Sequence, residues 1–246
     1  MQSARIKALP VLGIPLVQEG DNIAEMILRR AYLQERDVLV IASKIVSKAE
    51  GRVVNASSVE VSERAREIAD RTGFDPIHVE LALREANEIV REDGVLITET
   101  KLGLVCNFSG VDKSNAPSKD YVLLPVDPDQ SANRIQENLV RLSGKSVAVV
   151  ISDTHGRPWR KGSVNIAIGC AGINAFKHNR GKLDLHGRTL KRSSVCQIDE
   201  LASLVEPLMG QAGEKVPVVI VRGYDYSEGK EGARDISRTK EEDMFR

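Results

Sequence analysis

The chain has 246 residues, 41% hydrophobic and 28% charged, which is the composition of a soluble globular protein. Its 35 Lys and Arg equal its 35 Asp and Glu, so the overall charge favours neither nucleic acid nor an anionic membrane, and we expect no partner of either kind. The N-terminus lacks a signal-peptide core, no apolar run is long enough to span a membrane, and the three cysteines form no C-x-x-C, so the sequence predicts a cytoplasmic protein without disulfides or structural zinc.

The first third of the chain predicts two strands separated by a helix, followed by a long helical segment. "RIKALPVLGIPLV" predicts a strand interrupted by two prolines and a glycine, and Asp21 is expected to cap the helix that follows. "DVLVIAS" predicts a buried strand. Lys44 and Lys48 come directly after it, and a spacing of four places them on one face of either a helix or a strand. Residues 59–93 are predicted to be helical, with a break at "TGFDP".

The middle of the chain predicts a hairpin, a helix and a strand. "GVLITETKLGLVCNFSGVDKSN" alternates like a hairpin and places Asp112 and Asn115 on the segment after it. "DPDQSANRIQENLVRLSG" predicts a helix that begins near a proline and ends at a glycine, with Leu142 among its inward residues. Val147–Ile151 predicts a short buried strand that delivers Asp153 to its carboxyl end, where open α/β sheets place their sites.

The "ISDTHG" stretch permits several interpretations. It resembles the first metal-binding block of calcineurin-like phosphoesterases, but only His178 and His186 follow it, so the several Asp, Asn and His ligands of a two-metal site are missing. Asp153 could also simply cap the following turn. Three cations follow within eight residues, and a carboxylate beside cations suits a polyphosphate with its metal ion. Trp159 is expected to be buried rather than to stack on a substrate.

Residues 154–198 are locally basic, with nine Lys or Arg, three of the four His and a single acid. A nucleic-acid-binding module would use such a surface, but this one lacks the interleaved aromatic residues on which bases stack. "DELASLVEPLMGQ" then predicts a helix and "VPVVIVRG" a buried strand. The expected core stripe of that helix consists of Leu201, Leu204, Val205 and Leu208.

Separated blocks along the whole chain agree on one family. In order, they are "LGIP", "IASKIVSKAEGR", "GVDKSN", "ISDTHGRPWRKG" with "NIAIGCAGI", and "MGQ". Together they resemble the F420 gamma-glutamyl ligase family in its short, stand-alone form, so residues 1–246 are expected to be a single ligase unit. The resemblance implies an α+β, mixed-sheet fold particular to that family, in an intertwined homodimer.

The activity implied by the resemblance is the GTP-dependent joining of coenzyme F420-0 to L-glutamate, then of a second glutamate through a gamma-linkage. An acyl phosphate is the expected intermediate, and no protein nucleophile is required, so no catalytic residue is expected beyond the metal site. A metal-dependent phosphoesterase is the alternative. The implied cofactors are Mg²⁺ or Mn²⁺, with GTP as co-substrate and K⁺ as a further candidate ion.

The resemblance also assigns site residues. The metal positions are Asp112, Asp153, Thr154 and Gln211. The nucleotide positions are Leu12, Gly13, Ile14, Pro15, Ser43, Lys44, Lys48, Asn115 and Gly210. The cations after "ISDTHG", which are Arg157, Arg160 and Lys161, are expected to take the anionic groups of the coenzyme or of the incoming glutamate.

Overall fold

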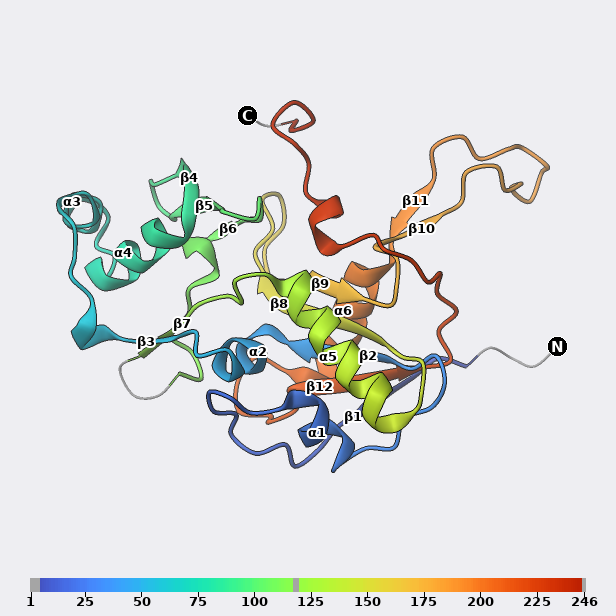
Figure 1. The fold of residues 1–246 in the computed structure, drawn as a ribbon. Helices are drawn as coiled ribbons and strands as arrows, with labels where there is room; N and C mark the ends of the chain where they lie inside the picture. Colours follow the sequence, from blue (N-terminus) through green and yellow to red (C-terminus); the bar gives the residue numbers. More distant parts are fainter. Residues whose placement is uncertain (1–4, 117–119, 245–246) are drawn as a thin grey trace.

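The computed structural model describes residues 5–116 and 120–244, and its centre is a five-stranded mixed sheet (Figure 1). The strand order is β1–β12–β2–β8–β9, in which β2 and β8 run parallel and the other three pairs antiparallel. The bounds are β1 Lys7–Pro10, β2 Val38–Ala42, β8 Ala148–His155, β9 Val164–Ala171 and β12 Val218–Arg222. The continuously apolar predicted strands are therefore confirmed as the interior of the sheet.

Helices cover both faces of this sheet. The helices are α1 Ile23–Leu28, α2 Ser43–Ala49 and α5 Pro128–Ser143 on one side, and α6 Gln197–Met209 on the other. Successive strand residues alternate between the two cores, so Leu39 and Ile41 pack on the α1 and α5 side while Val38 and Val40 pack on the α6 side. No helix of the described residues combines the length and the apolar character needed to cross a membrane.

Smaller units flank the sheet at opposite ends of the molecule (Figure 1). At one end, α3 Glu63–Thr72 and α4 Pro76–Glu85 pack beside a sheet of β4 Ala86–Arg91, β5 Ile97–Thr100 and β6 Val105–Asn107. At the other end, β10 Phe176–His178 and β11 Ser194–Cys196 form the base of a projecting arm. The remaining elements are β3 Val53–Asn55 paired with β7 Asp120–Val122, and the 3₁₀ turns η1 Ala56–Ser58, η2 Phe108–Gly110 and η3 Ala233–Ile236.

The helix termini follow the expected capping chemistry, with one correction. Asp127 caps α5 through the Gln130 amide, Pro128 occupies its first turn, and Gly144 ends it in the left-handed conformation. The prediction that Asp21 caps the first helix is wrong. The cap is Asn22, because the Asp21 carboxylate accepts the Gln18 amide in the preceding turn.

The predicted helix over residues 59–93 is too long. It is interrupted as expected, but α4 ends at Glu85, and residues 86–91 form β4, which pairs with β5. The segment "ANEIVR" contains good helix formers, and its antiparallel partner overrides that local preference. The strand predicted as Val147–Ile151 is, in contrast, too short, because pairing with β9 extends β8 to His155.

Several residues expected in the core are at the surface. The exposed fractions of Leu142, Leu204 and Leu208 are 42%, 46% and 38%, and Trp159 is 75% exposed. The apolar stripe of α6 is narrower than the sequence suggests, because one row of side chains meets the sheet. This buried row consists of Ile198, Leu201, Ala202, Val205 and Met209.

A partly exposed ion pair ties α4 to the segment that follows β6. The Asp75 carboxylate caps α4, accepts the Tyr121 hydroxyl at 2.7 Å and pairs with Lys113. Burial alone would raise the pKa of Asp75, but bonds from Lys113, Tyr121 and a backbone amide outweigh it and lower the pKa to about 2.

We expect Asp75 to stabilise the protein above pH 4 and to lose that contribution as the pH falls from about 4 to about 2. The sign follows because the folded pKa lies below the unfolded one. Since the side chain is 35% exposed, solvent screening limits the effect to about 1 kcal/mol. Urea unfolding of the wild type and of Asp75→Asn between pH 6 and pH 2 measures it. Parallel pH profiles for the two proteins would contradict the prediction.

Candidate active site

One edge of the central sheet collects most of the residues singled out in the sequence. The carboxyl ends of the parallel strands β2 and β8 lie here, with Ala42 paired to Ser152. The end of β1 and the start of β12 join the same edge, since the Val11 amide bonds to the Val218 carbonyl at 2.9 Å. Loops that leave these strands therefore converge, which is the arrangement expected for a site in an open sheet.

Asp153 is the buried anion of this edge. Its Oδ1 accepts a hydrogen bond from the Ser43 hydroxyl at 2.5 Å, across from the first turn of α2. The residue retains partial solvent contact, but its carboxyl group lies inside the fold. Desolvation raises the pKa of Asp153 to about 6, against bonds and charges from Ser43 and Lys44, and the nearby Asp112 carboxylate raises it further.

Asp112 and Lys44 form the charged pair next to Asp153. The Lys44 ammonium lies 2.7 Å from Asp112 Oδ2 and also contacts the Ser114 hydroxyl. Burial raises the pKa of Asp112, but hydrogen bonds from Lys44 and Ser114 outweigh this and leave the pKa below its usual value. Lys44 lies near both Asp112 and Asp153, so one of the two carboxylate charges is left uncompensated by Lys44.

Lys48 lies one helical turn beyond Lys44. The helical alternative for this segment is the one observed, and α2 presents both ammonium groups on one side. The Lys48 ammonium donates to the Asn115 carbonyl at 2.6 Å, and the Asn115 amide donates to the Ala212 carbonyl at 3.2 Å. Burial, followed by the charge of Lys44, lowers the pKa of Lys48. Two ammonium groups close enough for Lys44 to lower the pKa of Lys48 favour an anionic ligand.

Thr154 and Gln211 meet at the end of β8. The Thr154 hydroxyl lies 2.7 Å from Gln211 Oε1, and Gln211 follows the glycine that ends α6 with a φ of +67°. Asn165, which is 5% exposed, joins them from the paired position on β9, at 3.2 Å from both side chains. Sequence reasoning did not single out Asn165, although its block "NIAIGCAGI" belongs to the resemblance.

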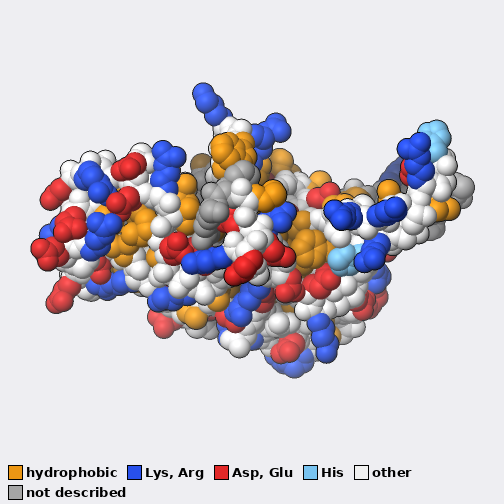
Figure 2. All heavy atoms as spheres, turned by 90° about the horizontal axis from the view of Figure 1, so that it is seen from above, with side chains coloured by type: hydrophobic (Ala, Val, Ile, Leu, Met, Phe, Trp, Pro, Cys, Tyr) orange, Lys and Arg blue, Asp and Glu red, His pale blue; other side chains and the backbone are white. Residues whose placement is uncertain are grey.

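The remaining predicted residues are less closely connected. The "LGIP" loop follows β1 at the same edge, and its Gly13, with a φ of +74°, is held through its carbonyl by Arg30 at 2.9 Å. Arg157 donates to two backbone carbonyls within the β8–β9 loop, where Arg160 and Lys161 are exposed. The other cations of the basic segment lie on the projecting arm (Figure 2) and do not reach this edge.

A phosphoesterase site finds no support in this geometry. The His155 ring lies against the backbone, with Nε2 2.8 Å from the Val105 carbonyl oxygen and Nδ1 next to the Gly156 carbonyl oxygen, so the ring is turned toward the chain. Within the part of the chain that the structure describes, no group of three or more His, Cys, Asp or Glu side chains could hold a metal ion. A two-metal hydrolase requires such a group.

The structure brings the predicted metal residues together as two pairs, Asp112 near Asp153 and Thr154 with Gln211, and their donor types are those that a hard divalent cation takes. Asp112, Asp153, Thr154 and Gln211 offer two carboxylates, a hydroxyl and an amide, all of them oxygen donors. The raised pKa of Asp153 favours a cation here, because divalent charge would compensate the desolvated carboxylate and its repulsion by Asp112. With two protein carboxylates, the rest of the coordination shell would come from neutral oxygens, water and the ligand.

Comparison with known proteins agrees with the blocks noted in the sequence. Residues 12–223 match the family model described as F420-0:Gamma-glutamyl ligase. The chain is 40% identical over 242 residues to the coenzyme F420:L-glutamate ligase of Archaeoglobus fulgidus, covering 98% of this chain and 97% of the relative. It is 45% identical over 249 residues to the protein of the same name from Methanopyrus kandleri, covering 98% and 99%. These matches show that the chain is a ligase and belongs to the F420-0:gamma-glutamyl ligase family.

Proposed function

We propose that this chain uses GTP to join L-glutamate to coenzyme F420-0 by an amide bond, and then adds a second glutamate by a gamma-linkage. The relatives named coenzyme F420:L-glutamate ligase support the two acidic substrates. The observation that carries the proposal is the buried Asp153 carboxylate, which lies near Asp112 and the Lys44 ammonium group, with Lys48 one helical turn beyond Lys44. Such an edge can hold a nucleoside triphosphate with its metal ion.

The reaction needs positioning rather than a protein nucleophile. The γ-phosphoryl group of GTP passes to a carboxylate oxygen of the coenzyme, and GDP leaves. The glutamate amine then attacks the acyl carbon, phosphate leaves, and the amine loses its proton. Proximity and charge neutralisation lower the barrier of both steps.

Asp112 and Asp153 would hold Mg²⁺ or Mn²⁺, together with the oxygens of Thr154 and Gln211. The ion would neutralise charge on the transferring phosphoryl group. Lys44 and Lys48 of α2 would bind the phosphates, while the Ser43 hydroxyl holds the Asp153 carboxylate by a hydrogen bond. We assign none of these residues to K⁺.

Substituting Lys48 should weaken nucleotide binding selectively. Lys48→Met keeps the apolar stem but removes the ammonium group, so we expect the KM for GTP to rise about tenfold, the loss of one charge-assisted phosphate contact. The KM for the coenzyme should change much less. Steady-state kinetics at saturating glutamate measure both. Lys145→Met at the opposite end of β8 is the matched control, and an equal KM for GTP in the two variants would refute the role of Lys48.

The proposed activity is tested by mass spectrometry of products from coenzyme F420-0, L-glutamate and GTP with Mg²⁺ or Mn²⁺. Addition of one or two glutamyl units with matching GDP release is the expected result, and ATP in place of GTP tests the nucleotide preference. GDP release without a glutamyl product would contradict the proposal. A homodimer is also proposed, and light scattering should give twice the 27.0 kDa chain mass.

A further inference from the structure

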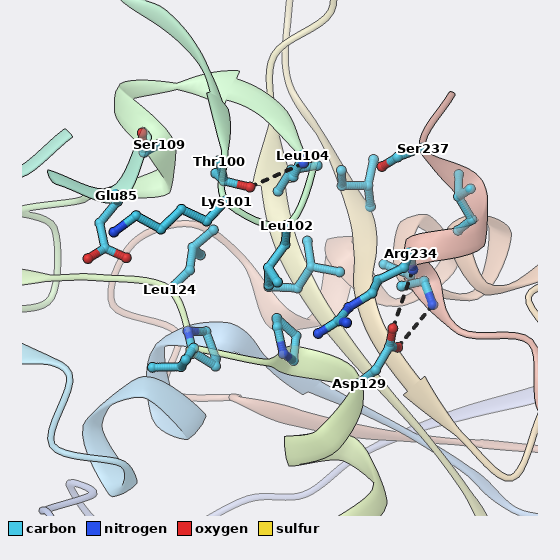
Figure 3. Close-up of a pocket in the computed structure, with 18 of the residues that line it drawn as sticks. Glu85, Thr100, Lys101, Leu102, Leu104, Ser109, Leu124, Asp129, Arg234 and Ser237 are labelled. Atoms are coloured by element: carbon cyan, nitrogen blue, oxygen red, sulfur yellow. Dashed lines mark hydrogen bonds between the residues drawn. The ribbon is translucent and has the colours of Figure 1, made fainter. Parts of the chain in front are cut away.

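A cavity of about 380 Å³ lies between the central sheet and the β4–β6 unit, in the size range of small-molecule sites. None of the residues assigned above to nucleotide, metal or substrate lines it. Its middle is apolar: Leu102 and Leu124 project into it between two charged ends (Figure 3). Ile166 and Ile168 of β9 contribute from the sheet, and η3 closes one side.

The cavity begins next to Asp153. Ile166 is the direct partner of Asp153 in the antiparallel β8–β9 pair, and directly opposite residues present their side chains to the same face. On the other side, Leu104 lines the cavity, and the carbonyl of the adjacent Val105 accepts the His155 ring at 2.8 Å. The cavity and Asp153 are therefore neighbours on one face of the sheet.

The carboxylates at the cavity are already occupied by protein groups. Asp129 Oδ1 accepts the Cys170 and Ala233 amides at 2.8 and 2.9 Å, and Asp199 accepts the Ala167 amide at 2.8 Å. These bonds hold the carboxylates to the backbone of β9 and η3 rather than presenting them to a ligand.

Two of the three cations that line the cavity are paired with carboxylates. Arg52 pairs with Glu85 at 2.6 Å, and Arg234 pairs with Asp127 at 2.5 Å. Lys101 extends toward Glu85 in the same charged end (Figure 3). A cavity with an apolar middle and charges of both signs at its ends suits a flat ring with polar groups at its rim, whereas phosphates and carboxylates fit the cationic edge at Lys44 and Lys48.

We propose that this cavity binds the planar deazaflavin ring of the acceptor coenzyme, an inference that rests on the proposed function. The ring packs between Leu102, Leu124 and the β9 isoleucines, and its polar rim meets the charged ends. The anionic tail of the coenzyme then runs from the cavity toward the metal site at Asp153, which lies directly opposite Ile166 on the neighbouring strand. In this arrangement the cavity recognises the coenzyme, and its carboxylate is phosphorylated at the sheet edge.

Filling the cavity tests this assignment. Leu102→Trp places a large ring in the cavity from the β5–β6 turn, and Val126→Trp does so from a lining residue that is 66% exposed and therefore tolerant of substitution. Each should raise the KM for coenzyme F420-0 at least tenfold and leave the KM for GTP within twofold. Leu142→Trp, on the outer face of α5, is the matched control and should alter neither.

Equilibrium titration of the coenzyme, followed by its own fluorescence, separates this inference from the proposed function. Wild-type turnover with an unchanged coenzyme KM in both cavity variants would overturn the cavity assignment alone. If the wild type binds the coenzyme but forms no glutamyl product, and the cavity variants lose that binding, the cavity assignment would be supported and the ligase proposal overturned. An altered oligomeric state with unchanged coenzyme affinity would assign the cavity to a subunit contact and overturn the inference.

Discussion

Asp153→Asn should abolish glutamyl transfer while leaving the protein folded. The substitution keeps the shape of the side chain and the acceptor for the Ser43 hydroxyl, but removes the buried negative charge. If Asp153 holds the metal ion, several kcal/mol of charge stabilisation is lost, and a loss of about 4 kcal/mol lowers kcat by ~10³-fold. Single-turnover and steady-state assays with GTP, coenzyme and glutamate measure this loss.

Stability provides the control for the same variant. Because burial disfavours the charged carboxylate, removing the charge should leave the melting temperature unchanged or raise it. Asp70→Asn, on the exposed side of α3, is the matched isosteric control and should keep full activity. If the Asp153→Asn enzyme keeps more than a tenth of the wild-type kcat, Asp153 is not a ligand of the metal ion.

The sequence predicts the convergence at the sheet edge only in part. Apolar runs identify β2 and β8 as buried strands, and the rule that sites lie at carboxyl ends of strands directs attention to Asp153 and to the lysines after β2. Their meeting depends on β2 and β8 being parallel neighbours, although 110 positions separate Ser43 from Asp153. Periodicity carries no information about which strands pair.

Thr154, Gln211 and Asn165 show why the rest of the site could not be derived from local pattern. Gln211 reaches Thr154 only because α6 crosses the far face of the sheet and ends beside β8, a contact across 57 positions. Asn165 is placed by the register of β9 against β8. The cavity is still harder to foresee, because its lining comes from separate stretches of the chain and from the turn η3 in the polar tail.

Arg222→Met should lower the free energy of unfolding by about 3 kcal/mol, the largest effect on stability that we expect from substituting a single Lys or Arg. The Asp37 carboxylate is fully buried at the start of β2, and Arg222 at the end of β12 donates to both of its oxygens at 2.8 and 2.7 Å. Removing the guanidinium leaves a buried charge with the Gln34 amide as a remaining donor. Breaking one partner of a buried pair typically costs about 3 to 5 kcal/mol, and the partial exposure of Arg222 supports the lower value.

A double-mutant cycle distinguishes the ion pair from the packing of the arginine stem. Asp37→Asn combined with Arg222→Met removes the stranded charge, so the double variant should recover at least about 1 kcal/mol relative to Arg222→Met in urea unfolding. This pair lies at the opposite edge of the sheet from Asp153, so the folded fraction of each variant should retain its kcat below the melting transition. Additive losses from the two substitutions would show that the strands are held by packing and that the pair contributes no coupling.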